Sequence, residues 1–145
     1  MSPVAVLLIA TGTLAGIIKA SNLKSALLNF MDFAGISDIF IAPVSGALMS
    51  GASASTTAGA VIASSTFASA IKAAGISAVW GAAMVNAGAT VLDHLPHGSF
   101  FHVTAGAVEL KFSKRLKLVL LESLIGASIA ASSTISCIIF EICFN

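Results

Sequence analysis

The chain has 145 residues, of which 57% are hydrophobic and 9% are charged, and its formal net charge is +1. Soluble domains carry about a quarter charged residues, so this composition, with a mean hydropathy of +1.03, excludes an ordinary soluble domain. The balanced charge and the lack of a basic–aromatic pattern exclude nucleic acid as a partner. Several separate apolar stretches instead predict an all-α membrane protein with polytopic transmembrane helices in a lipid bilayer.

Two elements are expected before residue 35. Residues 3–18 predict an apolar helix, with an interruption around Thr11-Gly12-Thr13 as an open alternative. This segment has no basic run before its apolar part and further apolar segments follow it, so it does not resemble a secretory signal. Residues 20–33 are amphipathic and predict a short helix at the membrane interface.

A first helix–break–helix unit is predicted over residues 38–74. Ser37 is the expected N-cap of a helix from Asp38 that kinks near Pro43 and ends around Gly51. The sequence GASAST (51–56) then breaks the helical pattern. The second helix is expected over 57–74, since Lys72 in its last turn and Gly75 beyond it form a helix stop.

A second unit is predicted over residues 77–110. Residues 77–92 form a small-residue helix that runs into the break LDHLPHGSF (92–100). Ser99 is expected to cap a helix that continues to about Leu110. A charged loop over 109–117 then leads to a terminal transmembrane helix over 118–143.

The two units share one layout within a single membrane domain, residues 1–145. Each is longer than the roughly 20 residues that one span requires, and each is too short for two spans with a loop. A broken helix or a re-entrant hairpin fits this length better. Non-helical backbone at that depth is tolerated only where it is buried in protein or lines a wet cavity, so a site is expected at the breaks.

The remaining charges and cysteines give weaker expectations. By the positive-inside rule, the basic residues of the charged loop face the cytoplasm; these are Lys111, Lys114, Arg115 and Lys117. The rule does not distinguish re-entrant units from fully crossing ones. Cys137 and Cys143 lie six positions apart on different faces of the terminal helix, so neither a disulfide nor a metal site is expected.

The first break offers hydroxyl groups at the start of a helix. Unpaired backbone N–H groups and the helix dipole make such an N-terminus an anion site, and transporters use half-helix N-termini to hold substrate carboxylates. The alternative to an anion site is a structural role, in which small residues allow close helix packing and their hydroxyl groups bond to the preceding turn. The candidate substrate-binding residues here are Ser53, Ser55, Thr56 and Thr57.

The second break places Asp93 beside His94 and His97. A carboxyl group inside a membrane is costly unless it is paired or hydrated, and histidine titrates near neutral pH. These three residues are therefore candidates for proton coupling or for the counter-charge to a substrate. An aqueous turn between ordinary helices is the alternative. A zinc site that also uses His102 is a third interpretation, although its spacing is not a standard one.

Neighbouring polar residues extend this candidate site. Asn86, Thr90 and Asp93 would share one helix face and line the same cavity. Gly98 and Ser99 begin the following helix and are further candidates for substrate binding.

At this point the motifs resemble the C-terminal part of the gluconate permease family (GntP type). That family has a GSATV-like break, then a D-S-L-P-H-[S/N]-G-like break, a basic loop and a terminal helix. The stretch TGTLAGIIKASNLKSAL also looks like the family's glycine-rich segment, so the resemblance covers residues from about 10 to 135. The D-x-L-P-H-G core is fairly specific, whereas the serine-rich break alone is not.

The resemblance implies secondary active transport in the bacterial inner membrane. Family members carry gluconate and related hydroxy-, keto- or amino-carboxylates with protons, and they belong to the ion-transporter superfamily of inverted repeats. It implies that Asp93 and His97 carry the proton or steer charge, and that Ser53, Ser55, Thr56 and Ser99 hold the carboxylate and hydroxyl groups. Asp93, Pro96, His97 and Gly98 match the second motif, whereas His94 replaces its serine and Phe100-Phe101-His102 replaces a smaller continuation.

Such permeases are about three times this length, so only their second half or less is matched. A midplane pocket is built between two repeats, which makes a missing N-terminal repeat, a second subunit or a second copy of this chain an expected partner. No cofactor is expected. The alternatives are a small structural or regulatory membrane protein, with LDHLPHGSF in bulk water, and a hydrolase using the Asp–His pair. The chain has no G-x-S-x-G motif, so no enzyme is expected.

Overall fold

The structure, a computed structural model, describes residues 3–144, except for the side chains of 3–5, 7, 8, 11, 15, 19 and 142–144. The regular elements of this part of the chain are all helices, as the composition predicts. In chain order they are α1 (Pro3–Ala20), α2 (Leu23–Phe33), the 3-10 turn η1 (Asp38–Phe40), α3 (Ile41–Ser53), α4 (Thr56–Ala73), α5 (Ala78–Ala89), α6 (Ser99–Ala107) and α7 (Phe112–Phe144).

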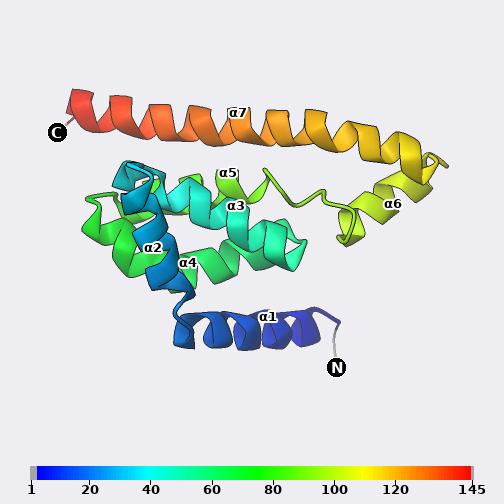
Figure 1. Ribbon diagram of the computed structural model, residues 1–145, viewed down its shortest axis with the longest axis horizontal. Coiled ribbons are helices and arrows are strands. Elements are labelled where there is room, and N and C mark those ends of the chain that lie inside the picture. Colours follow the sequence, from blue (N-terminus) through cyan, green and yellow to red (C-terminus); the bar gives the residue numbers. More distant parts are fainter. Residues whose placement is uncertain (1–2, 145) are drawn as a thin grey trace.

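Helices α3, α4 and α5 pack together at the centre of the molecule (Figure 1). α3 and α5 run in the same direction and α4 runs against them, while α7 packs along α5 and α1 packs on α4. The core contains Ile62, Phe67 and Met84, and α2 adds Leu27 and Met31 to it. As a result of these directions, the C-terminal ends of α3 and α5 meet the N-terminal end of α4.

Two glycines bring the backbones of α3 and α5 into contact. A Cβ atom at Gly46 would lie 2.2 Å from the Val85 carbonyl oxygen, and one at Gly88 would lie 2.0 Å from the Pro43 carbonyl oxygen. No side chain fits at such distances. The small residues of this region therefore serve close helix packing, which is the usual reason for their enrichment in membrane helices.

The connection between α4 and α5 follows the predicted stop signal. Gly75 has a φ of 80°, and the Ile76 N–H donates to the Ile71 carbonyl oxygen at 3.3 Å, which closes a Schellman-type C-cap. Ser77 then caps α5 by accepting a hydrogen bond from the Trp80 N–H at 3.4 Å.

Several predicted boundaries are wrong. α1 continues through residues 11–13 without the interruption, and Asp38 begins a 3-10 turn rather than an α-helix. Pro43 lies in the first turn of α3, where a missing N–H leaves no hydrogen bond unmade, so no kink is needed. α5 ends at Ala89 rather than 92. The N–H groups of Thr90 and Val91 donate to the carbonyl oxygens three residues earlier, as in a 3-10 turn, rather than to those four residues earlier, as in an α-helix.

The predicted charged loop is also shorter than expected. α6 ends at Ala107, and α7 begins at Phe112, so the terminal helix starts six positions before 118. Three of the four basic residues therefore lie on α7 itself rather than in a loop, and Lys111 precedes it. The Cys137 thiol is free and buried, and the side chain of Cys143 lies outside the described part of the chain.

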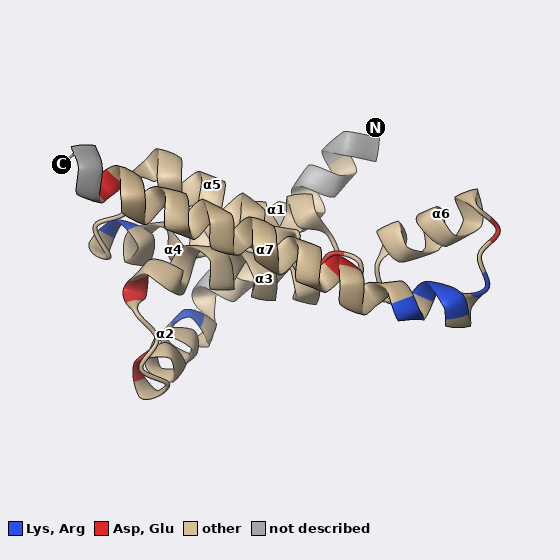
Figure 2. Cartoon of the chain, turned by 90° about the horizontal axis from the view of Figure 1, so that it is seen from above, with Lys and Arg blue, Asp and Glu red and all other residues tan. Residues whose placement is uncertain are grey.

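Within the described residues, one helix is long and apolar enough to cross a bilayer, and it is α7 over Phe112–Glu141. These 30 residues span about 45 Å, compared with about 30 Å for the hydrocarbon core. Its most apolar stretch has a mean hydropathy of 1.8 and is 17% buried inside the protein, so most of its side chains face outward. The Lys and Arg residues of α7 gather at its N-terminal end, beside α6 (Figure 2).

Candidate functional site

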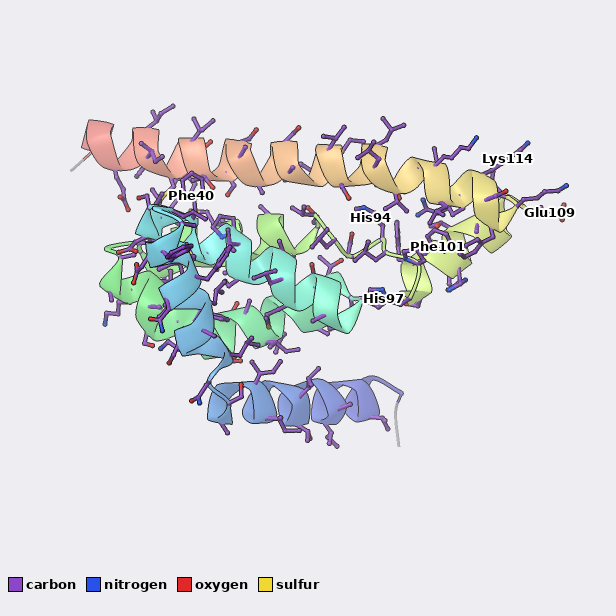
Figure 3. The ribbon with its side chains drawn as sticks, viewed as in Figure 1. Phe40, His94, His97, Phe101, Glu109 and Lys114 are labelled. Carbon is purple, nitrogen blue, oxygen red and sulfur yellow. The ribbon has the colours of Figure 1, made fainter. Side chains whose placement is uncertain are left out.

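The two polar breaks lie close together at one end of the helical bundle. The first break joins α3 to α4, and the second is the segment 90–98 that joins α5 to α6. Because α3 and α5 are parallel, both breaks fall at the same end, next to the N-terminal half of α7 (Figure 3). Chain segments about 40 residues apart therefore form one polar cluster.

The turn at the first break consists of two residues with non-helical backbone. Ala54 has a φ of 53°, and Ser55 is extended and caps α4 by accepting a hydrogen bond from the Ala58 N–H at 3.3 Å. The Ser53 hydroxyl donates to the Met49 carbonyl oxygen at 2.7 Å. Ser53 and Ser55 thus make local bonds that complete the turn and the helix start.

Asp93 occupies the N-terminal end of α4. Its Oδ2 atom accepts a hydrogen bond from the Thr56 hydroxyl, and its Oδ1 atom lies 3.1 Å from Nδ1 of His94. Thr56 is the first residue of α4, so the carboxylate meets the positive end of the helix dipole. The sequence predicts an anion site at this helix start, and the structure places the chain's own acid there.

His94 connects this acid to α7. The residue is 2% exposed, and its Nε2 atom lies 2.9 Å from the Ser123 Oγ and 3.1 Å from the Val119 carbonyl oxygen. Both ring nitrogens can donate only when the imidazole is protonated, in which case Asp93 and Val119 each accept a hydrogen bond. Ser123 and Val119 were not among the sequence-predicted residues, because they lie in an apolar helix without a local motif.

Replacing Ser123 with Ala is expected to lower the midpoint of thermal unfolding, because His94 loses one buried partner. A buried hydrogen bond of this kind contributes about 0.5–1.5 kcal/mol. Circular dichroism of the detergent-solubilised protein measures the change. Ser128→Ala is the matched control, because its hydroxyl bonds only to the Leu124 carbonyl oxygen at 2.8 Å on an exposed face. Equal midpoints for the two variants would contradict the role of Ser123.

His97 joins the second break to the end of α3. Its Nε2 atom lies 2.8 Å from the Gly51 carbonyl oxygen, which is free because the Ser55 N–H bonds to Ser50 instead. A ring N–H at this position satisfies one of the unpaired carbonyl groups of a helix C-terminus. Gly98 allows the approach, since a Cβ atom there would lie 3.0 Å from the Ala54 carbonyl oxygen.

A small cavity of about 180 Å³ opens beside this cluster. It lies between the second break, α6 and α7, and its polar residues are Thr90, Asp93, His94 and Glu122. Its apolar wall is formed by Phe100, Ile125, Gly126 and Ile129. A solute in this cavity would meet two carboxyl groups, one imidazole and one hydroxyl group.

Of the ten predicted site residues, Asp93 and His94 line the cavity and eight do not. Ser53, Ser55, Thr56 and Gly98 belong to the breaks beside it. Thr57 and Asn86 are exposed, and Asn86 separates from Thr90 and Asp93 because α5 ends before the last two. Ser99 is also exposed; it is the first residue of α6 rather than its cap, a position taken by the extended Gly98. His97 is exposed and contacts α3 instead of the cavity.

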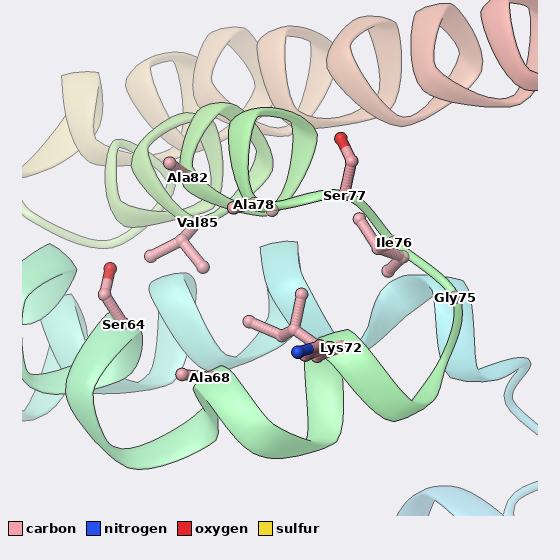
Figure 4. A pocket seen from close by; sticks show the side chains of 11 residues that line it. Ser64, Ala68, Lys72, Gly75, Ile76, Ser77, Ala78, Ala82 and Val85 are labelled. Carbon is pink, nitrogen blue, oxygen red and sulfur yellow. The ribbon is translucent and has the colours of Figure 1, made fainter.

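A larger cavity of about 600 Å³ lies at the other end of the α4–α5 pair (Figure 4). Lys72 is its one charged lining residue, and most of the others are small or apolar. It contains none of the predicted site residues. The polar breaks, rather than this cavity, therefore define the candidate site.

The zinc interpretation gains no geometric support. Over the described residues, no group of three His, Cys, Asp or Glu side chains lies close enough to hold a metal ion. His94 points to α7 whereas His97 points to α3, so the two imidazoles do not converge.

Comparison with curated proteins finds a relative with a transport assignment. The chain is 48% identical over 135 residues to an uncharacterized transporter of Haemophilus influenzae. The alignment covers 93% of this chain and 32% of the relative, so the chain spans about a third of the relative's length. No protein-family model matches the chain, and no solved structure matches it.

Proposed function

We propose that this chain forms the substrate-binding part of a secondary active transporter that carries a small carboxylate together with protons. The transporter relative supports transport as the function class. The resemblance to gluconate permeases, through GASAST and LDHLPHG, supports a gluconate-like hydroxy-, keto- or amino-carboxylate as the substrate. Interrupted helices with their N-termini at a polar cavity are the usual construction of such sites.

The observation that carries the proposal is the placement of Asp93. Its carboxylate lies at the N-terminus of α4, between the Thr56 hydroxyl and the His94 ring, and it lines the small cavity. A carboxyl group inside a membrane protein is costly unless it is paired, and such residues commonly mark proton pathways. Asp93 and His94 are the proposed proton-coupling residues.

Proton coupling follows from competition between two negative charges at one helix start. A substrate carboxylate that approaches α4 meets the charge of Asp93. Two unit charges about 4 Å apart repel by about 4 kcal/mol at an effective dielectric constant of about 20. A proton on Asp93 removes that repulsion and leaves the helix dipole and Thr56 free to hold the substrate. Proton and anion then favour each other's binding reciprocally.

The cavity volume suits a small solute. At about 30 Å³ per water molecule, 180 Å³ corresponds to roughly six waters, which is below the usual range for drug-sized ligands. The exposed apolar side chains of α7 suggest that further helices complete the pocket, from a longer polypeptide, a second subunit or a second copy of this chain. The proposed location is the bacterial inner membrane, with a multi-pass topology.

Uptake into liposomes tests the proposal. The protein, purified from its host membrane with any accompanying polypeptides, is expected to accumulate radiolabelled gluconate or a related acid when an inward proton gradient is imposed. A protonophore should abolish the accumulation, and a sodium gradient alone should not replace the proton gradient. If no carboxylate accumulates under either gradient, the proposed transport is wrong.

A further inference from the structure

Arg115 is a buried cation at the start of α7. Its side chain is 3% exposed, and its Nη1 atom lies 2.6 Å from Glu122 Oε2, two helical turns along. Its Nη2 atom is buried without a hydrogen-bond partner. Glu122 therefore supplies the one counter-charge that the described residues provide for this guanidinium.

The same guanidinium holds α6 against α7. Arg115 Nε donates to the Thr104 hydroxyl at 3.1 Å, and the guanidinium carbon lies 4.9 Å from the centre of the Phe101 ring. Phe101 is fully buried and also packs against Phe112 of α7, with ring centroids 5.2 Å apart. α6 lies beyond the ends of α3, α4 and α5 (Figure 1), so its attachment depends on these contacts with α7.

The counter-charge faces the cavity of the candidate site. Glu122 is 30% exposed at its side chain and lines the cavity together with Asp93 and His94, which are the other titratable groups there. Phe100 of α6 contributes to the same wall. Glu122, the counter-charge of Arg115, is therefore in contact with whatever the cavity contains. α6, which Arg115 holds against α7, forms part of the cavity wall through Phe100.

We propose that Glu122 and Arg115 couple the charge state of the cavity to the position of α6. When a proton or a bound cationic group neutralises Glu122, the guanidinium loses its counter-charge while it is still buried. A buried cation without a partner is strongly unfavourable, so Arg115 moves toward water and releases Thr104 and Phe101. α6 then leaves α7, and Phe100 opens one wall of the cavity. The inference rests on the proposed function, but its test does not require transport.

The test measures the distance between α6 and α7. Spin labels are attached at Val103→Cys and Leu120→Cys, which are 68% and 69% exposed, in the full chain carrying Cys137→Ala and Cys143→Ala. Double electron–electron resonance in lipid nanodiscs then gives the distance distribution. In the protein with Glu122 and Arg115 intact, the population with the longer distance should be about 10% or less. In Glu122→Gln, that population should become the major one. Glu109→Gln, in the exposed α6–α7 connection, should leave the distribution unchanged.

A double variant separates this coupling from general destabilisation. Arg115→Met with Glu122→Leu removes both charges, and the methionine still packs on Phe101, so the short distance should return. An unchanged distribution in Glu122→Gln would overturn the proposal, as would a long distance that persists in the double variant. Should Glu122→Gln fail to fold, a long distance in the double variant still overturns the proposal. None of these outcomes depends on carboxylate uptake, so the proposed function is tested separately by the uptake experiment.

Discussion

Asp93→Asn is expected to reduce proton-driven uptake strongly while leaving the protein folded. Asparagine has the shape of aspartate and still accepts a hydrogen bond from Thr56, but it has no carboxylate to bind a proton. Removing the proton site severs the reciprocal coupling described above, and each 1.4 kcal/mol of lost coupling corresponds to about a tenfold change. Gradient-driven accumulation in liposomes should therefore fall by on the order of tenfold or more.

Substrate exchange provides the internal control for this variant. Counterflow between labelled and unlabelled carboxylate requires no net proton movement, so it should persist in Asp93→Asn. Glu109→Gln, which alters an exposed acid remote from the cavity, should retain both activities. Full gradient-driven accumulation by Asp93→Asn would contradict the proposed role of Asp93.

Local signals in the sequence predict the stop of α4 and the break after α3, whereas the predicted caps Ser37 and Ser99 make no side-chain cap bond at the start of an α-helix. Lys72 and Gly75 identify the end of α4, because the role of a C-terminal glycine depends only on neighbouring backbone groups. GASAST likewise predicts the break, which the structure narrows to Ala54 and Ser55. The start of α7 has no such signal, since its basic first turns look equally like a loop.

The contacts of the candidate site depend on the path of the whole chain. Thr56 and Asp93 are 37 positions apart, and they meet only because α3 and α5 are parallel. A pattern of hydroxyl groups at a helix start predicts an anion site, but it does not indicate that an acid of the same chain fills it. Ser123 gives no signal at all, because a serine in an apolar helix most often bonds to its own helix.

Arg115 shows the same limit for charged residues. Between Lys114 and Lys117 it resembles one more cation of a basic patch, and such patches are normally solvated. Its burial arises because α6 lies beside α7 and places Phe101 and Thr104 around the guanidinium. No periodicity within α7 encodes that arrangement.

Gly88→Ala is expected to destabilise the bundle strongly. The added methyl group would lie 2.0 Å from the carbonyl oxygen and 2.7 Å from the carbonyl carbon of Pro43, and these are backbone atoms that cannot move aside independently. α3 and α5 must separate, which widens the gap between the two breaks. Overpacking of this kind costs about 1–3 kcal/mol or more, a large part of the 5–15 kcal/mol of a typical native state. Thermal unfolding in detergent, followed by circular dichroism, measures the loss.

Gly12→Ala is the matched control, because Gly12 also lies within a helix but has no atom within 4 Å of the added methyl group. An alanine in a helix interior is favoured over glycine by about 1 kcal/mol, so this variant should be neutral or slightly more stable. If glycine to alanine lowers the unfolding midpoint at Gly88 but not at Gly12, the backbone contact between α3 and α5 accounts for the difference. If Gly88→Ala unfolded at the unsubstituted midpoint, α3 and α5 would not be in backbone contact. The parallel arrangement that brings Thr56 to Asp93 would then lose its support.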